Sequence, residues 1–297
     1  KNELIYNLLI MWLKKVWLNK IWLGLAIVFL LAVVIFGKVL DGYLDKDGLM
    51  MLDRPINQLV IGLRRPLLDK FMLLVTLTGN WQMIVWGSLL GAVLLIIAQK
   101  RRYLMAMILS NLSAIIIKKK DKNLIGRDRP PIENALILEH GFAFPSGHSY
   151  FAVAFYGLLT YFWVRHFYQK WARMGVFILG FGYILLLGLS RIYLGVHWTT
   201  DVLGALSLGT ASLAVIVAYI EYKRKFFKEE YREVDRKKLW RNFGVFAALW
   251  LLGLFWLYQS RVKSLGIKII KPTRAAIEAT TRTAPAATSR GIVVSPY

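Results

Sequence analysis

Three polar stretches interrupt an otherwise apolar sequence, and each holds side chains that can bind an anion or move a proton. They read KNLIGRDRP at 122–130, PSGH at 145–148 and SRIYLGVHWTTD at 190–201. Histidine, which titrates near neutral pH, is the side chain that most often transfers protons in enzymes. The chain has 4 histidines in all, and two of them, His148 and His197, stand in these stretches.

The third stretch pairs a histidine with a carboxylate. His197 and Asp201 are four residues apart, so on a helix they would share a face one turn apart. A carboxylate bonded to one imidazole nitrogen fixes the tautomer and leaves the other nitrogen available for attack. Arg191 offers a guanidinium fork to an anion. The alternative is a loop histidine with an incidental acidic neighbour, which this stretch alone does not exclude.

The second stretch predicts a helix N-terminus that enters an apolar segment. Ser146 and Gly147 precede a helix from about His148, and helix N-termini present free N–H groups and a positive dipole end to anions. Ser146 adds a hydroxyl, and His148 would lie beside a bound anion. The alternative is a plain helix cap with Ser146 as the capping residue.

The first stretch brings two cations to a turn. Lys122 and Arg129 flank a glycine-containing segment that ends in Pro130, a rigid arrangement that suits a phosphate. An ordinary basic cluster beside the membrane is the alternative. Other lysines just upstream can compete with Lys122 for the phosphate: Lys118, Lys119 and Lys120.

Together the stretches predict phosphoryl transfer through a covalent intermediate. His197, oriented by Asp201, attacks phosphorus and forms a phosphohistidine. His148 protonates the leaving alkoxide and then activates water. The groups expected to hold the phosphate oxygens are Lys122, Arg129, Ser146, Gly147 and Arg191. Because these cations supply the charge, we expect no metal and no cofactor; they would also repel a zinc ion placed among the two histidines and Asp201.

The composition predicts a membrane protein of several spans. The 297 residues are 57% hydrophobic, and the mean hydropathy is +0.49. A net charge of +22 in a soluble protein would suggest nucleic acid, but here the basic residues lie mostly between apolar runs, so we expect no nucleic-acid partner. The absence of cysteine excludes disulfides and thiolate metal sites.

The apolar runs predict an all-α membrane bundle with seven spans, of which 103–117 is the shortest. The spans are expected at about 21–40, 81–98, 103–117, 148–164, 174–190, 202–220 and 243–258. No small-residue cleavage site follows the first run, which we expect to be retained. Residues 55–78 are too polar to span and are expected along the membrane surface.

The domain organisation follows from these spans. We expect an interfacial amphipathic helix at 1–20, a transmembrane catalytic domain at 21–220, a basic cytoplasmic linker at 221–241, an additional transmembrane helix at 242–258 and a disordered tail at 259–297.

Loop charges predict the orientation. The basic loops 99–102, 165–173 and 221–241 should be cytoplasmic by the positive-inside rule, although 118–147 is basic too. The three polar stretches then face the other side. We therefore expect a bacterial inner-membrane protein with its site on the periplasmic face.

All three stretches resemble the motifs of the type 2 phosphatidic acid phosphatase (PAP2) superfamily, K-x6-R-P, P-S-G-H and S-R-x5-H-x3-D. Every fixed position is filled at the family spacing, from Lys122 and Arg129-Pro130 to Asp201. The resemblance covers about 55–220 and implies a six-helix membrane core, to which 242–258 adds a further helix. It implies the same roles: His197 as nucleophile, Asp201 as its orienter, His148 as acid and base, and the remaining motif residues as phosphate ligands.

The function expected from motifs and spans together is a membrane lipid-phosphate phosphatase. Substrates of this class are phosphatidic acid, phosphatidylglycerol phosphate, undecaprenyl pyrophosphate and lipid A phosphates. A lipid phosphotransferase with the same site is the runner-up, in which a lipid hydroxyl replaces water. The superfamily also resembles vanadium haloperoxidases, but those are soluble. A non-catalytic scaffold or transporter is disfavoured because the spans carry almost no interior charge.

Overall fold

The described part of the protein consists of helices and loops. The computed structural model describes residues 2–45, 48–226 and 236–265, and the side chains of 2–19, 118–124, 225–226, 236–240, 243 and 261–265 lie outside the description. No strand occurs among the described residues, which confirms the all-α prediction. The tail expected at 259–297 falls mainly outside the described residues.

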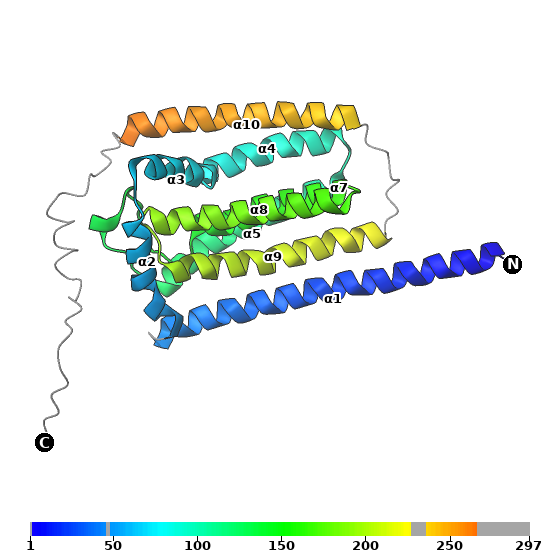
Figure 1. The fold of residues 1–297 in the computed structure, drawn as a ribbon, viewed down its shortest axis with the longest axis horizontal. Coiled ribbons are helices and arrows are strands. Elements are labelled where there is room, and N and C mark those ends of the chain that lie inside the picture. The colour runs from blue at the N-terminus through cyan, green and yellow to red at the C-terminus, as the bar shows by residue number, and fades with distance from the viewer. Residues whose placement is uncertain (1, 46–47, 227–235, 266–297) are drawn as a thin grey trace, which may run out of the picture.

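The long helices run roughly side by side and form a bundle (Figure 1). In chain order the elements are α1 (Asn2–Asp45), η1 (Gly48–Leu52), α2 (Asp53–Gly62), α3 (Pro66–Thr78), α4 (Trp81–Ile97), α5 (Arg101–Ile125), η2 (Ile132–Asn134), α6 (Gly147–Phe151), η3 (Ala152–Gly157), α7 (Leu158–His166), α8 (Lys170–Tyr193), α9 (Thr199–Phe226) and α10 (Arg236–Leu265). The short helix α2 lies across one end of this bundle.

Three of the described helices are long and apolar enough to cross a membrane, Lys20–Asp45, Lys170–Tyr193 and Thr199–Arg224. The pair α3 and α4 passes the same test as one span bent by 52°, and α10 contributes the shorter apolar segment Gly244–Ser260. The sequence predicted seven spans. The difference arises in part because the predicted 148–164 span is divided into α6, the π-helical η3 and α7.

Several boundaries differ from those expected. α1 continues without a break from Asn2 to Asp45, where the sequence predicted two helices and a break at residue 41. Only α2 lies across the end of the bundle, whereas α3 buries Met72 and residues 75–78 in the interior, so the surface segment predicted at 55–78 is half as long. The two helices are separated at residues 63–65, directly before Pro66, a residue favoured at the first position of a helix.

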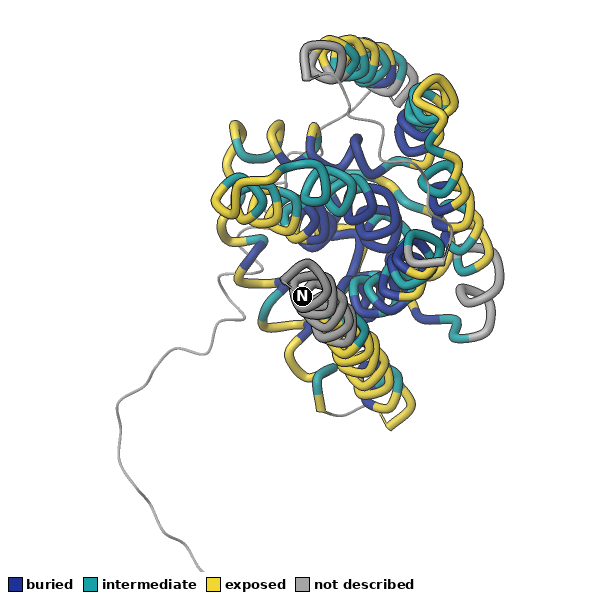
Figure 2. The backbone as a smooth tube through the Cα atoms, turned by 90° about the vertical axis from the view of Figure 1, so that its right-hand side faces the viewer, coloured by how far each residue is buried: buried dark blue, intermediate teal, exposed yellow. Residues whose placement is uncertain are grey.

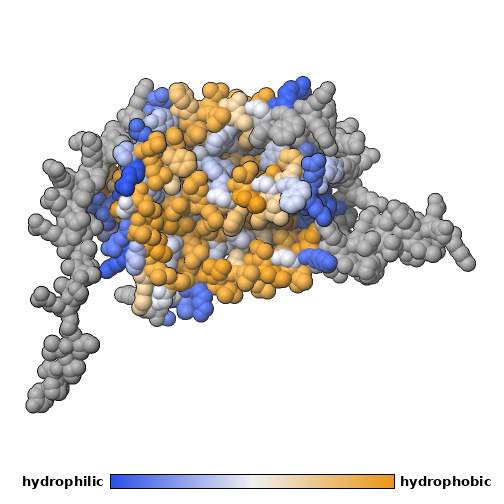
Figure 3. Space-filling view, viewed as in Figure 1, coloured by the Kyte–Doolittle hydropathy of each residue, from blue (hydrophilic) through white to orange (hydrophobic). Residues whose placement is uncertain are grey.

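The surface has the distribution of a membrane protein. Figure 2 shows buried residues at the centre of the bundle and exposed ones around it, and many of the exposed side chains are large and apolar, among them Leu30, Leu179 and Trp256. Figure 3 shows the apolar side chains as a belt, with hydrophilic residues at the two ends of the helices. Lipid can cover such a belt because the backbone polar groups of these helices are hydrogen-bonded within each helix.

The connections fall at two ends of the bundle. The α4–α5 and α7–α8 connections lie at the same end as the C-terminus of α9 and the N-terminus of α10 (Figure 1). These are the basic segments that the sequence assigned to the cytoplasm. The connections α5–α6 and α8–α9, which carry the three motifs, lie at the opposite end beside α2.

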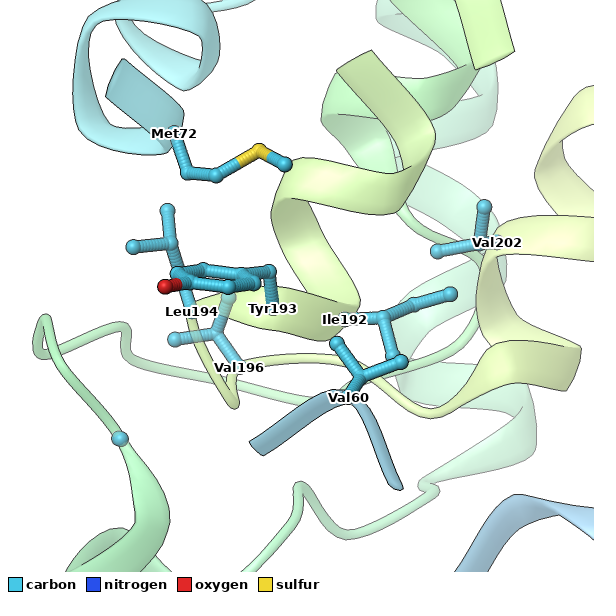
Figure 4. Packing of buried hydrophobic residues seen from close by; sticks show 8 residues of the cluster. Val60, Met72, Ile192, Tyr193, Leu194, Val196 and Val202 are labelled. Atoms are coloured by element: carbon cyan, nitrogen blue, oxygen red, sulfur yellow. The ribbon is translucent and has the colours of Figure 1, made fainter. Parts of the chain in front are cut away.

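A buried apolar cluster supports the α8–α9 connection (Figure 4). It joins α2, α3, α8 and α9 through Val60, Met72, Ile192, Tyr193, Leu194, Val196 and Val202. Leu194 and Val196 are nearly fully buried and stand just before His197. Burial of side chains of this size contributes about 1.5–3 kcal/mol each to the free energy of unfolding. The apolar cluster therefore stabilises the conformation of the loop that carries His197.

The C-terminal helix α10 packs on α3 and α4 (Figure 1). The Trp86 indole N–H donates a hydrogen bond to the Leu249 carbonyl, and the absence of a side chain at Gly253 leaves room for the Trp86 ring. Leu257 is buried with Leu77 and Met83. This helix is therefore a packed part of the described bundle.

Candidate active site

The three motifs meet at the end of the bundle that α2 covers. Arg191 lies in the last turn of α8 and Asp201 in the first turn of α9, and the connection between them carries His197. Ser146 is the residue before α6, and Arg129 lies in the α5–α6 connection. Side chains predicted from three separate stretches are thus brought to one place.

A sharp turn before His197 sets its position. Gly195 has φ +73, and a Cβ there would lie 2.2 Å from the Asn134 carbonyl oxygen. Only glycine adopts that conformation readily and permits that approach. Arg64 fastens the same turn by donating hydrogen bonds to the carbonyls of Tyr193 and Asn134.

His197 lies between a carboxylate and a guanidinium. Its Nδ1 is 3.4 Å from Asp201 Oδ2, and its Nε2 is 3.3 Å from Arg129 Nη1. The imidazole is 1% exposed. The predicted i, i+4 pair therefore forms, with Nε2 facing the predicted phosphate ligand Arg129.

Asp201 is held from several sides. Its Oδ2 accepts a hydrogen bond of 2.8 Å from the backbone N–H of Trp198, and its Oδ1 accepts one from Arg127. Trp198 directly precedes α9 and Asp201 is the third residue of that helix, so this is the contact that a capping-box carboxylate makes. The orientation of the carboxylate is fixed by the helix that carries it.

Arg129 joins the two connections that form the site. Its Nε donates to the Gly141 carbonyl at 2.8 Å, and its Nη1 donates to the Val196 carbonyl at 2.8 Å. These two hydrogen bonds fix the position of the Arg129 guanidinium next to His197. An arginine held in this way is preorganised for an anion.

Arg191 is fully buried and meets a carboxylate that the sequence did not predict. Its Nη1 donates to Thr76 Oγ1 and its Nη2 to Glu139 Oε1, each at 2.6 Å. The other oxygen of Glu139 is 3.8 Å from Arg129 Nη2. Burial alone would raise the pKa of Glu139, but the charges of Arg191, His148 and Arg129 outweigh it and lower the pKa to about 2.

Glu139 therefore contacts both predicted phosphate-binding arginines, so a phosphate has to compete with it. We expect Glu139→Gln to lower the inhibition constants of inorganic phosphate and vanadate by about tenfold, a change of about 1.4 kcal/mol. Because the pKa of Glu139 is about 2, the effect should be constant across neutral pH. Steady-state inhibition of phosphate release measures it.

The matched control is Glu133→Gln, an exposed glutamate in the same connection, which should leave both inhibition constants unchanged. Weaker inhibition in Glu139→Gln would mean that the carboxylate positions the arginines for phosphate and does not compete with it.

His148 is bonded to a residue at the α3–α4 bend. Its Nε2 lies 2.7 Å from Asn80 Oδ1, and Asn80 directly precedes α4. The amide oxygen accepts, so it favours a proton on Nε2. Asparagine before a helix ordinarily indicates a cap. Nothing in the sequence indicates that this one contacts His148, 68 residues away.

Ser146 and Gly147 stand at the start of α6, a helix of about one turn that is followed directly by the π-helix η3. Ser146 is fully buried, its backbone N–H donates to the Asp201 carbonyl at 3.2 Å, and its Oγ accepts from Ser149. A Cβ on Gly147 would meet no protein atom within 4 Å. The α6 start is therefore open on the side of Gly147, and the π-helix η3 that follows is of a type common at functional sites.

The side chain of Lys122 lies outside the described residues, as do those of Lys118, Lys119 and Lys120. Their backbone belongs to α5, which continues to Ile125, eight residues beyond the predicted end of the 103–117 span. Lysine is a good helix former, so the helix continues through the charged run, where the sequence predicted a loop.

Arg127 occupies a position between two carboxylates. Besides Asp201, it binds Asp53 at the start of α2. No sequence motif includes Asp53, which lies 74 residues from Arg127 in the chain.

The chain is similar to known membrane phosphatases. Residues 99–225 match the family model of the PAP2 superfamily. A curated relative, phosphatidylglycerophosphatase B of Bacillus subtilis (strain 168), is 29% identical over 197 residues, which are 66% of this chain and 96% of the relative.

A solved structure shares the arrangement of helices. It is the transmembrane PAP2-type phosphatidylglycerolphosphate phosphatase from Bacillus subtilis, with a TM-score of 0.58 and 27% sequence identity over 68% of this chain and 98% of that one. The chain is a phosphatase that is similar to the PAP2 superfamily over residues 99–225, the region that carries all three motifs.

Proposed function

We propose that this phosphatase hydrolyses a lipid phosphate, with phosphatidylglycerol phosphate as the first candidate substrate. The observation that carries the proposal is the position of His197, with Asp201 on one nitrogen and Arg129 near the other, at one end of an apolar bundle. The names of both relatives support the choice of lipid.

The proposed reaction has two steps at phosphorus. His197 Nε2 attacks the phosphate while the bond to the lipid oxygen breaks, and His148 gives its proton to that oxygen. Water then attacks the phosphohistidine, His148 takes the water proton, and the P–N bond breaks to release inorganic phosphate. Asp201 stabilises the imidazolium character that His197 acquires in each step.

The phosphate oxygens are assigned to groups already fixed in place. Arg129 and Arg191 supply charge, Ser146 supplies its hydroxyl, and the start of α6 supplies the backbone N–H of Gly147. Lys122 is kept as the fifth ligand on the spacing of its motif. Since Arg129 and Arg191 are held by hydrogen bonds within the fold, little reorganisation of their guanidinium groups is needed when charge develops in the transition state.

The site is proposed to face the periplasm across a bacterial inner membrane. The motif end of the bundle is opposite the end that collects the basic connections, which the positive-inside rule assigns to the cytoplasm. A lipid whose tails lie in the apolar belt would present its phosphate at the edge of this belt, where the motif end of the bundle begins (Figure 3).

A phosphate-release panel tests the proposal. Purified protein in detergent is given phosphatidylglycerol phosphate, phosphatidic acid, undecaprenyl pyrophosphate and a lipid A phosphate, and we expect the first to give the highest kcat/KM. A higher value for another lipid would change the assigned substrate, and release from none would contradict the proposal. Mass analysis with a second lipid alcohol present separates hydrolysis from phosphotransfer.

Metal removal should leave the activity intact, because the guanidinium groups and backbone amides supply the positive charge. We expect the rate of phosphate release after EDTA treatment to stay within about twofold of the untreated rate. An enzyme that depends on a catalytic metal would instead lose several kcal/mol of transition-state stabilisation when the metal is removed. A full loss that Mg²⁺ or Zn²⁺ restores would overturn this mechanism.

A further inference from the structure

We propose that Asp53 and Arg127 are positioning residues that keep one net negative charge beside His197. The proposal rests on the proposed function, in which His197 is the nucleophile. It extends the site to α2, an element outside all three sequence motifs.

The geometry begins with a shared guanidinium. Arg127 donates from Nη1 to Asp201 Oδ1 and from Nη2 to Asp53 Oδ2. Asp53 is 3% exposed and Asp201 is fully buried. A guanidinium that bridges two buried carboxylates orients both, because its five donors lie in one rigid plane.

A second set of contacts ties Asp53 to the helix that carries Asp201. Asp53 Oδ1 accepts from the Thr200 backbone N–H at 2.9 Å, and its Oδ2 accepts from Thr200 Oγ1 at 2.6 Å. Thr200 directly precedes Asp201 at the N-terminus of α9. Asp53 is thus bonded to the backbone next to Asp201 as well as to its ion-pair partner.

The charges of the cluster explain why two carboxylates are present. With Arg127 alone, the guanidinium would largely cancel the charge of Asp201, and His197 would gain little from it. Asp53 satisfies the other half of the guanidinium, so the three buried groups together keep one negative charge. That charge favours the cationic forms of His197 through which the proposed reaction passes.

Other charged groups also face this part of the site. Arg129 is 3.3 Å from His197 Nε2, and beyond it lie Glu139 and Arg191, which pair with each other, and His148 on α6. None of the contacts of Asp53 involves these groups in the described residues. Substitutions at Asp53 and Arg127 therefore change the charge on the Asp201 side alone.

The proposal predicts pH shifts of opposite sign. Asp53→Asn removes a negative charge and keeps most of the hydrogen-bond geometry, so His197 should lose its proton more easily and the acid limb of kcat/KM should move to lower pH. Arg127→Gln removes a positive charge, and the limb should move to higher pH. We expect about 0.5–1 pH unit in each direction, below the effect of a charge in direct contact.

A double variant and an exposed control make the test specific. Asp53→Asn combined with Arg127→Gln removes one charge of each sign, so its limb should return close to the wild-type position even if the rate is reduced. Asp128→Asn, the same change at an exposed neighbour of Arg127, should cause no shift. Size-exclusion profiles in detergent confirm that each variant folds.

The experiment combines phosphate release with ¹⁵N NMR of histidine-labelled protein across about pH 5 to 9, with the His197 signal assigned by its loss in His197→Ala. The imidazole signal reports protonation without turnover, so an inactive wild type would contradict the proposed function and leave this test readable. Opposite shifts in the two single variants, reversed in the double variant, support the proposal. Equal rate losses with an unshifted titration, or shifts of the same sign, would overturn it.

Discussion

Replacement of His197 by alanine is expected to lower phosphate release at least about 10⁴-fold, the scale on which nucleophile variants of covalent enzymes lose activity. The imidazole Nε2 is the atom proposed to bond phosphorus, and Asp201 lies beside the other ring nitrogen and can orient it. Arg129 is held by hydrogen bonds to the Val196 and Gly141 carbonyls, which do not involve the His197 side chain. The loss should therefore come from chemistry and not from collapse of the site.

Alkaline quenching during turnover of ³²P-labelled lipid preserves the intermediate and measures it directly. The wild type should carry acid-labile, base-stable label, and His197→Ala should carry none. His140→Ala, an exposed histidine of the α5–α6 connection, is the matched control and should keep both label and rate. Label that persists in His197→Ala would assign the nucleophile to another residue.

Replacement of His148 by alanine is expected to lower kcat on a lipid substrate by about 10²–10⁴-fold, the usual contribution of general acid–base catalysis. A lipid alkoxide is a poor leaving group and needs the proton that His148 is proposed to supply. A p-nitrophenolate departs without a proton. The same variant should therefore lose much less in the first step with p-nitrophenyl phosphate, which burst-phase release of p-nitrophenol measures.

The comparison between leaving groups identifies the role of His148. His166→Ala, at the opposite end of the bundle in α7, controls for the loss of a histidine and should leave both substrates unaffected. Equal losses with the lipid and the aryl phosphate would show that His148 binds phosphate and does not protonate the leaving oxygen.

The motifs predicted most of the site because each is local in sequence. His197 and Asp201 are one helical turn apart, and a short-range rule is enough to pair them. The partners that the analysis missed come from elsewhere in the chain: Asn80 is 68 residues from His148, and Glu139 is 52 residues from Arg191. No local pattern marks such contacts, since they depend on how α3, α4 and the α5–α6 connection fold back onto α8.

The sequence predicted helix boundaries well where an apolar run was long, and less well where charged residues followed the run. The run at 174–190 lies within α8, whereas the charged residues after 117 predict the end of a helix that in the structure continues to Ile125. Hydropathy measures burial in lipid, but a helix persists into water when its residues favour it. Neither hydropathy nor helix propensity predicts that a π-helix divides 148–164, because a π-helix differs from an α-helix in which backbone groups are hydrogen-bonded.

The contact between Asp201 and the Trp198 N–H has a consequence for how this protein can evolve. Active-site residues usually reduce stability, so that substitutions there strengthen the fold at the expense of activity. Here one carboxylate completes the first turn of α9 and faces His197. Loss of such a cap costs about 0.5–2 kcal/mol. A substitution at this position that removes the cap would weaken fold and catalysis together.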